Sequence, residues 1–374
     1  MTVLIADELP RPAQGTLTVY LLGPGVGESE VIALPDGKCI VVDCCTKGGV
    51  NLPIELLQHL GIASVEAIVL THPDLDHLRG IADVVRRFPP QHVFRYPGDK
   101  YVRDLVACWI EKSPSNARYR ELSEAIKTID AHTNKRQRRW DLCATTRPWC
   151  PAGAPYTIHF LAPTPFDRDR VGSVLRKVVQ LRDGEFGLSE RFERVLRGEA
   201  DLGDTPNVLS LALVIEWAGR KVLLAGDVEN GTSSPESGWK GVLALLDDQD
   251  NPWGPLGHLV EDVELVKVAH HGSQGAFFAS AWARHAKSKK TMAMVAPYSP
   301  KSLPSDATLV HLRTYCSHLG ISAEGGDAFT RAEAAGWAQV KGRVPSTTAH
   351  CVAAVLDPSG DLKLFRGMGA ALFQ

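Results

Sequence analysis

Four potential metal ligands stand within six positions, directly after a short apolar segment. Residues Val65–Leu70 are mostly apolar and predict a buried strand, and the sequence His72-Pro73-Asp74-Leu75-Asp76-His77 follows it. A tight loop that leaves a buried strand can bring such side chains to one point, because the strand supplies the rigidity that a metal site needs. Mixed imidazole and carboxylate ligands suit zinc, manganese or iron better than calcium or magnesium. The alternative is a solvated loop in which Asp74 or Asp76 caps the next helix.

Two later segments repeat this arrangement. Val222–Ala225 is an apolar segment that leads into Gly226 and Asp227, and Val266–Ala269 leads into the sequence His270-His271-Gly272-Ser273. Singly, each polar residue could cap a helix or lie in a turn. Jointly, we expect the three strands to lie in one sheet and to deliver their ligands at its carboxyl edge, which predicts a metal centre.

The remaining pattern predicts an α/β fold in which two sheets pack together under outer helices. Strands are expected at Thr16–Leu22, Val31–Leu34, Cys39–Val42, Val65–Leu70, Tyr156–Leu161, Val208–Trp217, Lys221–Ala225, Val263–Ala269, Thr291–Ala296, Ala349–Leu356 and Leu362–Phe365. Helices are expected at Asn51–Leu60, Leu78–Phe88 and Ser189–Arg197, and in the polar stretch that runs to about Trp140. We expect one domain over residues 1–374, with insertions near 100–150 and 164–205.

Net charge, apolar runs and cysteine spacing limit the classes of protein to which this chain can belong. The formal net charge is −2, which excludes a general attraction to nucleic acid or to an acidic membrane but allows a local basic patch. We expect neither a secretion signal nor a membrane span, since the first residues lack a basic start with an apolar stretch and no run of about 18 apolar residues occurs. The eight cysteines show no CxxC spacing, so free thiols in a reducing cytoplasm are expected. A zinc site at Cys44 and Cys45 is the less favoured alternative.

Together the motifs resemble the metallo-β-lactamase superfamily, whose signature is His-x-His/Asp-x-Asp-His followed by a distal Gly-Asp and a late histidine. The resemblance is closest to the hydrolase domain of ComEC, the bacterial DNA-uptake channel protein. It rests on an early strand that ends at Asp43 and on four motifs within about residues 16–300: Thr71–His77, Asn207–Leu213, Leu224–Asp227 and His270–Ser273. It implies an αββα sandwich, with two mixed sheets face to face and helices outside.

The resemblance also implies two divalent metal ions, zinc or manganese, held by seven side chains: His72, Asp74, Asp76, His77, Asp227, His270 and His271. His72 and Asp74 would hold the first metal. Asp76 and His77 would hold the second, and Asp227 would bridge the two. One of the paired histidines would complete the second site, and the other would be free to bond the substrate or the leaving group. The expected catalytic residues are two of the same set, Asp76 and His271.

The chain departs from the family pattern at the first metal. Many members supply another histidine from a mid-chain loop, where this chain has Asn207. His159 is a candidate substitute, although a histidine within a predicted strand is more often a core residue. With Asp74 and Asn207 in place of histidines, the first site is expected to be weaker and to favour manganese.

Residues around the ligands suggest how a substrate is held. The usual Gly-Gly after the metal loop is Arg79-Gly80 here, so Arg79 is expected either to hold a substrate phosphate or to face solvent. Asn207 and Ser273 are the other expected substrate-binding residues. Asp43 is a candidate acceptor for a hydrogen bond from a ligating imidazole.

The leading hypothesis for function is a phosphodiesterase or nuclease that acts on nucleic acid or on a nucleotide. A dinuclear site suits phosphoryl transfer, and the basic run Lys135–Arg139, flanked by Trp140 and Trp149, could follow a phosphate backbone and stack bases. The alternative for that run is a solvated helix end. Two other hypotheses stay open: a hydrolase of a small ester, thioester, lactone or lactam, and a non-catalytic metal-binding scaffold in a multi-protein system.

Overall fold

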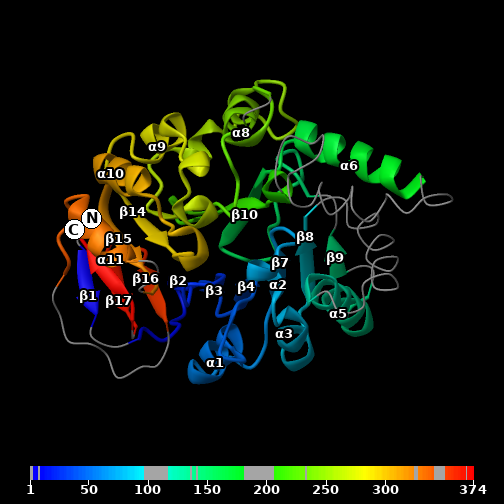
Figure 1. Cartoon of the computed structure of the whole chain (residues 1–374), viewed down its shortest axis with the longest axis horizontal. Helices are drawn as coiled ribbons and strands as arrows, with labels where there is room; N and C mark the ends of the chain where they lie inside the picture. The colour runs from blue at the N-terminus through cyan, green and yellow to red at the C-terminus, as the bar shows by residue number, and fades with distance from the viewer. Residues whose placement is uncertain are drawn as a thin grey trace.

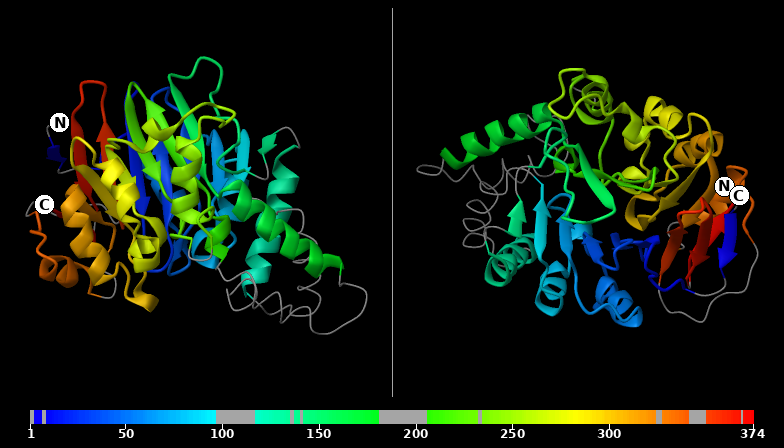
Figure 2. Two further views of the ribbon diagram at one scale, coloured as in Figure 1. Left: turned by 90° about the horizontal axis from the view of Figure 1, so that it is seen from above. Right: turned by 180° about the vertical axis from the view of Figure 1, so that it is seen from behind.

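The computed structural model of this chain describes residues 3–6, 9–96, 117–134, 137–139, 142–180, 206–231, 234–323, 327–340, 350–367 and 369–374. Over these residues the protein folds into four layers (Figures 1 and 2). Two β-sheets pack face to face in the centre, and helices cover the outer face of each. This arrangement confirms the predicted α/β, αββα sandwich.

The first sheet contains nine strands within the described part of the chain. Their order is β1 (Val3–Ala6), β17 (Leu362–Arg366), β16 (Cys351–Leu356), β2 (Leu17–Leu22), β3 (Ser29–Ala33), β4 (Cys39–Val42), β7 (Ala67–Leu70), β8 (His92–Arg95) and β9 (Arg138–Arg139). Strands β4, β7 and β8 are parallel neighbours, so their carboxyl ends lie at the same edge of this sheet. A separate short ribbon joins β5 (Thr46–Lys47) to β6 (Val50–Asn51).

The second sheet contains seven strands within the same described ranges. Their order is β10 (Tyr156–Ala162), β11 (Ala212–Trp217), β12 (Arg220–Leu224), β13 (Leu265–Lys267), β14 (Thr291–Val295), β15 (Cys316–Ile321) and β18 (Ala371–Phe373). Strands β12 to β15 run parallel to one another. The carboxyl ends of β12 and β13 therefore also share one edge.

The helices form the two outer layers (Figure 1). The first sheet is flanked by α1 (Leu52–His59), α2 (Leu75–Leu78), α3 (Ile81–Arg87) and α5 (Ala117–His132), and the second by α8 (Gly238–Asp247), α9 (Ala279–His285), α10 (Asp306–Tyr315) and α11 (Ala328–Ala334). Helix α6 (Pro165–Gln180) extends along one end, and short 3-10 helices occupy Pro206–Leu209, Gly257–Val260, Ala269–Gly272, Gln274–Ala276 and Ser299–Lys301. None of the described helices is long and apolar enough to cross a membrane.

Alternating side chains divide the buried residues into two cores. Along β11 and β12, successive side chains face opposite sides of the sheet. Leu213 and Leu224 belong to the core between the sheets, whereas Val214 and Leu223 belong to the core beneath the outer helices. Because both faces of the sheet are covered, these strands are continuous apolar segments in the sequence. This pattern made them predictable.

Most predicted strands are present, with ends shifted by a few residues. The helix predicted at Asn51–Leu60 is α1, and the Asn51 side chain caps it by accepting a hydrogen bond from the Ile54 amide. The continuous helix predicted at Leu78–Phe88 was wrong: the chain turns at Gly80, whose φ is 87°, and resumes as α3. The sequence also did not predict β1, β8, β15 and β18, which are short or carry polar residues.

The expectation that the three ligand-bearing strands share one sheet was wrong. Strand β7 belongs to the first sheet, whereas β12 and β13 belong to the second. The ligands meet because the two sheets pack face to face with these carboxyl ends at the same edge. A strand's own sequence carries no information about which sheet it joins, since partner choice depends on segments far away in the chain.

Two predictions lie partly outside the described residues. The insertions expected near 100–150 and 164–205 are described only at 117–134, 137–139, 142–150 and 164–180, and the helix expected at Ser189–Arg197 is outside altogether. The seven described cysteines are free thiols. None of them joins either potential metal-binding group among the described residues, so a Cys44–Cys45 zinc site is not supported.

Candidate metal centre

The predicted ligands converge between the carboxyl ends of β7, β12 and β13. His72 lies in the loop after β7, and the single turn of α2 presents His77. Asp227 follows β12, and His271 lies in the 3-10 turn after β13. All four side chains are buried, with at most 2% of the residue exposed. Asp74 stands at the N-cap position of α2 without a capping hydrogen bond from its side chain.

Two sets of ligand atoms face the two oxygens of Asp227. On one side, Nε2 of His77 lies 3.5 Å from Oδ1 of Asp227. On the other side, Nε2 of His72 and Nε2 of His270 lie 4.0 and 3.9 Å from Oδ2. Asp74 Oδ2 lies 3.6 Å from the His72 nitrogen. Asp227 thus stands between two groups of side chains, as a bridging ligand would.

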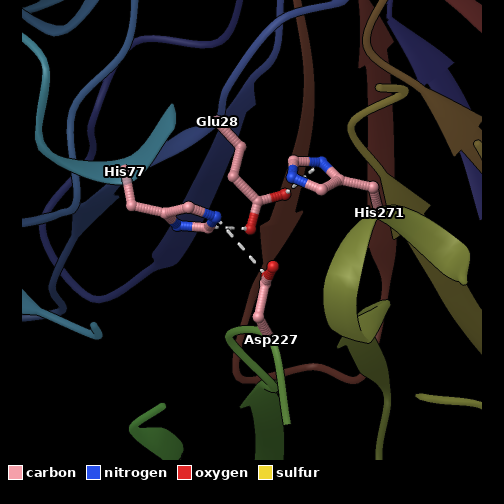
Figure 3. A group of neighbouring side chains, drawn as sticks. All are labelled: Glu28, His77, Asp227 and His271. Atoms are coloured by element: carbon pink, nitrogen blue, oxygen red, sulfur yellow. Dashed lines mark ion pairs between the residues drawn. The ribbon is translucent and has the colours of Figure 1, made fainter. Parts of the chain in front are cut away.

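The ring of His271 joins the first of these sides. Its Nε2 lies 3.4 Å from Oδ2 of Asp76. Its ring centroid is 5.7 Å from that of His77. Figure 3 shows His77, His271 and Asp227 around one point, together with Glu28. The structure therefore separates the paired histidines, with His271 beside Asp76 and His77, and His270 beside Asp227 and His72.

Several buried ligand atoms have no hydrogen-bond partner among the described residues. They are Nε2 of His72, His77 and His271, and Oδ1 of Asp227. An unpaired buried polar atom costs about 1–3 kcal/mol, and four of them in one cluster are hard to reconcile with a site that exists only for stability. Imidazole nitrogens and a carboxylate oxygen are the donor set that zinc or manganese takes, so the residues present fit divalent metal ions.

The opposite edge of each ring is held by an acceptor. Nδ1 of His77 donates to Asp43 at 2.8 Å, Nδ1 of His271 donates to the Ala296 carbonyl at 3.0 Å, and Nδ1 of His270 lies 3.0 Å from Glu229 Oε1. Such bonds set the tautomer in which Nε2 keeps its lone pair, which is typical of metal-ligating histidines. The position of Asp43 matches the role predicted for it.

A strained turn gives the paired histidines their different directions. His270 and His271 both have left-handed backbones, with φ of 47° and 52°. Non-glycine residues in this region cost about 1–2 kcal/mol each. The result is that adjacent rings lie at 64° to one another with centroids 6.3 Å apart. Backbone strain of this kind clusters at functional sites.

The charges of the cluster favour cation binding. Burial and the neighbouring His77 ring lower the pKa of His72 well below its ordinary value, so this ring is neutral at pH 7. Burial by itself would raise the pKa of Asp76 and Asp227, but the adjacent histidines outweigh it and lower both. Both carboxyl groups are therefore ionised, which is the form that binds a metal ion.

The sequence missed several side chains around the ligands. Glu28 and Lys267 are buried beside Asp227 and His271, and Glu229 contacts His270. The Tyr298 ring stacks on His271 with centroids 5.1 Å apart. Of these residues, only Lys267 could have been identified from the sequence, because a lysine inside an apolar strand is rarely buried without a partner.

Other predicted residues lie near the ligands or apart from them. Asn207 is buried and donates to Glu229 at 3.1 Å, which places it behind His270. Arg79 is exposed at the end of α2. Ser273 lines a small cavity together with residues that include Trp239, and its buried hydroxyl has no hydrogen-bond partner among the described residues.

Two further candidates are explained by other contacts. His159 lies on β10 with Nε2 3.4 Å from Glu216, outside both potential metal-binding groups among the described residues. In the basic run, Arg138 belongs to β9 and is bonded to Asp130 at 2.5 Å and to Thr133. The prediction that this run is a helix end was therefore wrong at this residue, while Lys135, Arg136 and Trp140 lie outside the described residues.

Comparisons with known proteins give the family. Among solved structures, the chain is similar to YhfI from Bacillus subtilis (12% identity, 82% of this chain and 95% of that chain, TM-score 0.40) and to Igni18, a metallo hydrolase from Ignicoccus hospitalis (12%, 79% and 91%, TM-score 0.38). It is also similar to a diphosphatase of the PhnP family (13%, 78% and 90%, TM-score 0.37). Similarities this distant carry no information about substrate. No curated protein matched the sequence. Residues 22–273, more than half of the chain, match the metallo-beta-lactamase superfamily, and the protein belongs to this superfamily of metal-dependent hydrolases.

Proposed function

We propose that this protein is a phosphodiesterase that cleaves a phosphodiester bond in nucleic acid or in a nucleotide. The observation that carries the proposal is the division of ligand atoms into two sets on the two oxygens of Asp227. Two divalent ions held in this way would lower the pKa of a water molecule and stabilise charge on the attacking and leaving oxygens as the phosphate ester is hydrolysed.

The two metal positions would use different residues. His72, Asp74 and Asp227 would hold the first position, and His270 would complete it, since its Nε2 also faces Oδ2 of Asp227. The second position would be held by Asp227 and three further residues: Asp76, His77 and His271. His270 thereby takes the place of the mid-chain histidine that this chain lacks. We expect manganese or zinc, with manganese favoured at the first position because of its carboxylate ligands.

One side of the ligand group is open to solvent. The side chains of Asp74 and Asp76 are 25% and 23% exposed and that of His270 is 13% exposed, whereas His72 and His77 are buried. A substrate therefore approaches over the two aspartates. Asp76 is the residue that would accept a proton from the attacking water, because its carboxylate is ionised and reaches this open side.

Two cations border the opening. Arg79 and Lys301 are both exposed. Arg79 lies close enough to Tyr298, which stacks over His271, for their charges to interact, and Lys301 stands in the same relation to His270. Positive side chains on either side of a metal centre attract an anionic substrate and orient its phosphate oxygens. These two cations would not strengthen the binding of an uncharged lactam or ester.

The resemblance to the ComEC hydrolase domain also favours nucleic acid. It rests on the four motifs quoted above and not on fold alone, which does not identify a substrate. Within the basic run, Arg138 does not add support, since it is bonded to Asp130. A short strand or a single nucleotide is therefore as suitable a substrate as long duplex DNA.

The test is metal-dependent cleavage by the purified protein. Single-stranded DNA, double-stranded DNA and bis-p-nitrophenyl phosphate are incubated with Mn²⁺ or Zn²⁺, with wild type beside Asp76→Ala. Asp169→Ala serves as the matched control, because this carboxylate is 69% exposed on α6 and is bonded to Arg168. We expect cleavage by wild type and the control and its loss in Asp76→Ala. A metal-loaded protein that cleaves a chromogenic lactam or ester but no phosphodiester would overturn the proposal.

A further inference from the structure

A buried lysine and a buried glutamate join the two sheets beside the ligand group. Lys267 is the last residue of β13, and Glu28 directly precedes β3. Each is only 1% exposed. Nζ of Lys267 donates to Oε1 of Glu28 and, at 2.9 Å, to the carbonyl of Gly226. The hydrolysis proposed above uses neither side chain.

Glu28 lies beside the ligands of the second metal position, on the Nδ1 side of two histidine rings. Its Oε2 is 3.3 Å from Nδ1 of His271, and its Oε1 is 3.9 Å from Nδ1 of His77. Figure 3 shows the carboxylate between these two rings, with Asp227 close to it. One ligand atom from each of these four residues lies within 4.8 Å of the others, a spacing at which they could hold a single ion. Glu28 is therefore a potential extra ligand.

Lys267 is placed to prevent that coordination. Its ammonium is bonded to Glu28 and lies 3.7 Å from Oδ1 of Asp227. A carboxylate that is engaged by an ammonium is a poorer metal ligand than a free one. A hydrolytic metal site keeps a coordination position for water or substrate, and an additional protein carboxylate would occupy that position.

Folding stability alone does not explain the pair. Removing an ammonium and a carboxylate from water costs several kcal/mol each, and replacing a buried ion pair by apolar residues is often neutral or stabilising. A contact of this kind, between residues 239 positions apart, needs another reason. Its place beside three ligands of one metal position supplies that reason.

We propose that Lys267 holds Glu28 out of the coordination of the second metal, so that one coordination position stays open. Lys267 is then a positioning residue that acts through Glu28. This inference rests on the metal binding in the proposed function and is independent of the substrate.

Single and double substitutions separate this role from a structural one. In Lys267→Met, Glu28 is released to the metal, so we expect the affinity of the second position to rise about tenfold, the scale on which neighbours of ligands act. In Glu28→Gln, the uncompensated charge of Lys267 lowers that affinity by about the same factor. The double variant has neither charge and returns close to wild type. Lys221→Met, on the adjacent strand β12, is the control.

Two readouts need no substrate. Metal affinity is measured by competition with a chelating dye, and bound Co²⁺ is followed by its visible absorption, which weakens as the coordination number rises. We expect weaker absorption in Lys267→Met, unchanged absorption in Lys221→Met, and lower turnover only in the former. Absence of metal binding by wild type would contradict the proposed function itself.

A structural role gives a different pattern. If Lys267→Met and Glu28→Gln both weaken metal binding and both lower the free energy of unfolding of the metal-free protein, the proposal is wrong. If Lys267→Met does not fold, the comparison of Glu28→Gln with the double variant decides. Affinity restored in the double variant supports the proposal, and affinity that stays low overturns it.

Discussion

Nδ1 of His77 donates a hydrogen bond to Oδ2 of Asp43 at 2.8 Å, and Nε2 of the same ring faces Oδ1 of Asp227 at 3.5 Å. The Asp43 carboxylate also accepts hydrogen bonds from the backbone amide of Thr71 at 2.8 Å and from its hydroxyl at 2.6 Å. A single buried carboxylate therefore fixes both the end of β7 and the direction of a metal ligand.

Asp43→Asn should weaken metal binding without disturbing the fold broadly. An asparagine amide cannot accept all three hydrogen bonds, and it tolerates the left-handed backbone at this position, where φ is 54°. We expect the metal affinity to fall about 10–100-fold and the free energy of unfolding to fall by about 1–3 kcal/mol. Dye competition and urea denaturation measure the two, with the exposed Asp83→Asn as control. Unchanged affinity would show that Asp43 only supports the strand end.

His270 and His271 should bind different metal ions. Wild type is expected to retain two tightly bound ions after dialysis, whereas His270→Ala and His271→Ala should each lose one. His270→Ala should then add nothing to the loss caused by Asp74→Ala, because both affect the first position. Atomic emission measures the metal content. Two ions retained by His270→Ala would instead make this ring a hydrogen-bond donor to the substrate or leaving group.

Removal of a cation at the opening should affect substrate binding more than metal content. We expect Arg79→Gln and Lys301→Gln each to lower kcat/KM for a phosphodiester about tenfold, which corresponds to the loss of one charge-assisted hydrogen bond. The loss should appear mainly in KM and shrink as salt rises, because exposed charges are screened. Lys287→Gln, on an exposed residue paired with Glu261, is the control. A fall in kcat alone would contradict a binding role.

Gly226 should be intolerant of a side chain. Its φ is +50°, and an added Cβ would lie within 3.0 Å of the Leu211 carbonyl oxygen and of the Ser210 hydroxyl. We expect Gly226→Ala to lower the free energy of unfolding by about 3 kcal/mol, from left-handed strain and overpacking together, and to weaken metal binding by moving Asp227. Gly219→Ala is the matched control, since φ is +74° there but no atom lies within 4 Å. Its expected cost is about 1 kcal/mol. Equal losses of unfolding free energy in Gly226→Ala and Gly219→Ala would show that the added Cβ does not clash at Gly226.

His285 should make stability depend on pH. Burial lowers the pKa of this ring to about 4, and the ring donates to the Val260 carbonyl. The unfolded chain binds a proton near pH 6.5, so the contribution is complete above pH 6.5 and is lost as pH falls toward 4. Between pH 7 and pH 5 we expect a loss of about 2 kcal/mol. Urea denaturation at both values should give a smaller difference for His285→Gln than for wild type, and no such reduction for the exposed His59→Gln.

Much of the local structure could be predicted because its causes are local. Asn51 caps α1 through an amide three residues away, and Ser305 caps α10 by accepting a hydrogen bond from the Thr308 amide. Strands buried on both faces, such as β7 and β12, are visible as apolar runs. Strand β15 was missed because its sequence, Cys-Ser-His-Leu-Gly-Ile, lacks that pattern.

The sequence by itself determined which residues could bind metal, because strand ends, ligand types and their spacing are written in short segments. Only the tertiary structure decided how they divide. It placed β7 in one sheet and β12 and β13 in the other, turned His270 and His271 apart through their left-handed backbones, and brought Glu28 to Lys267. The physical reason is that contacts between distant segments depend on how two sheets pack, and no short segment contains that information.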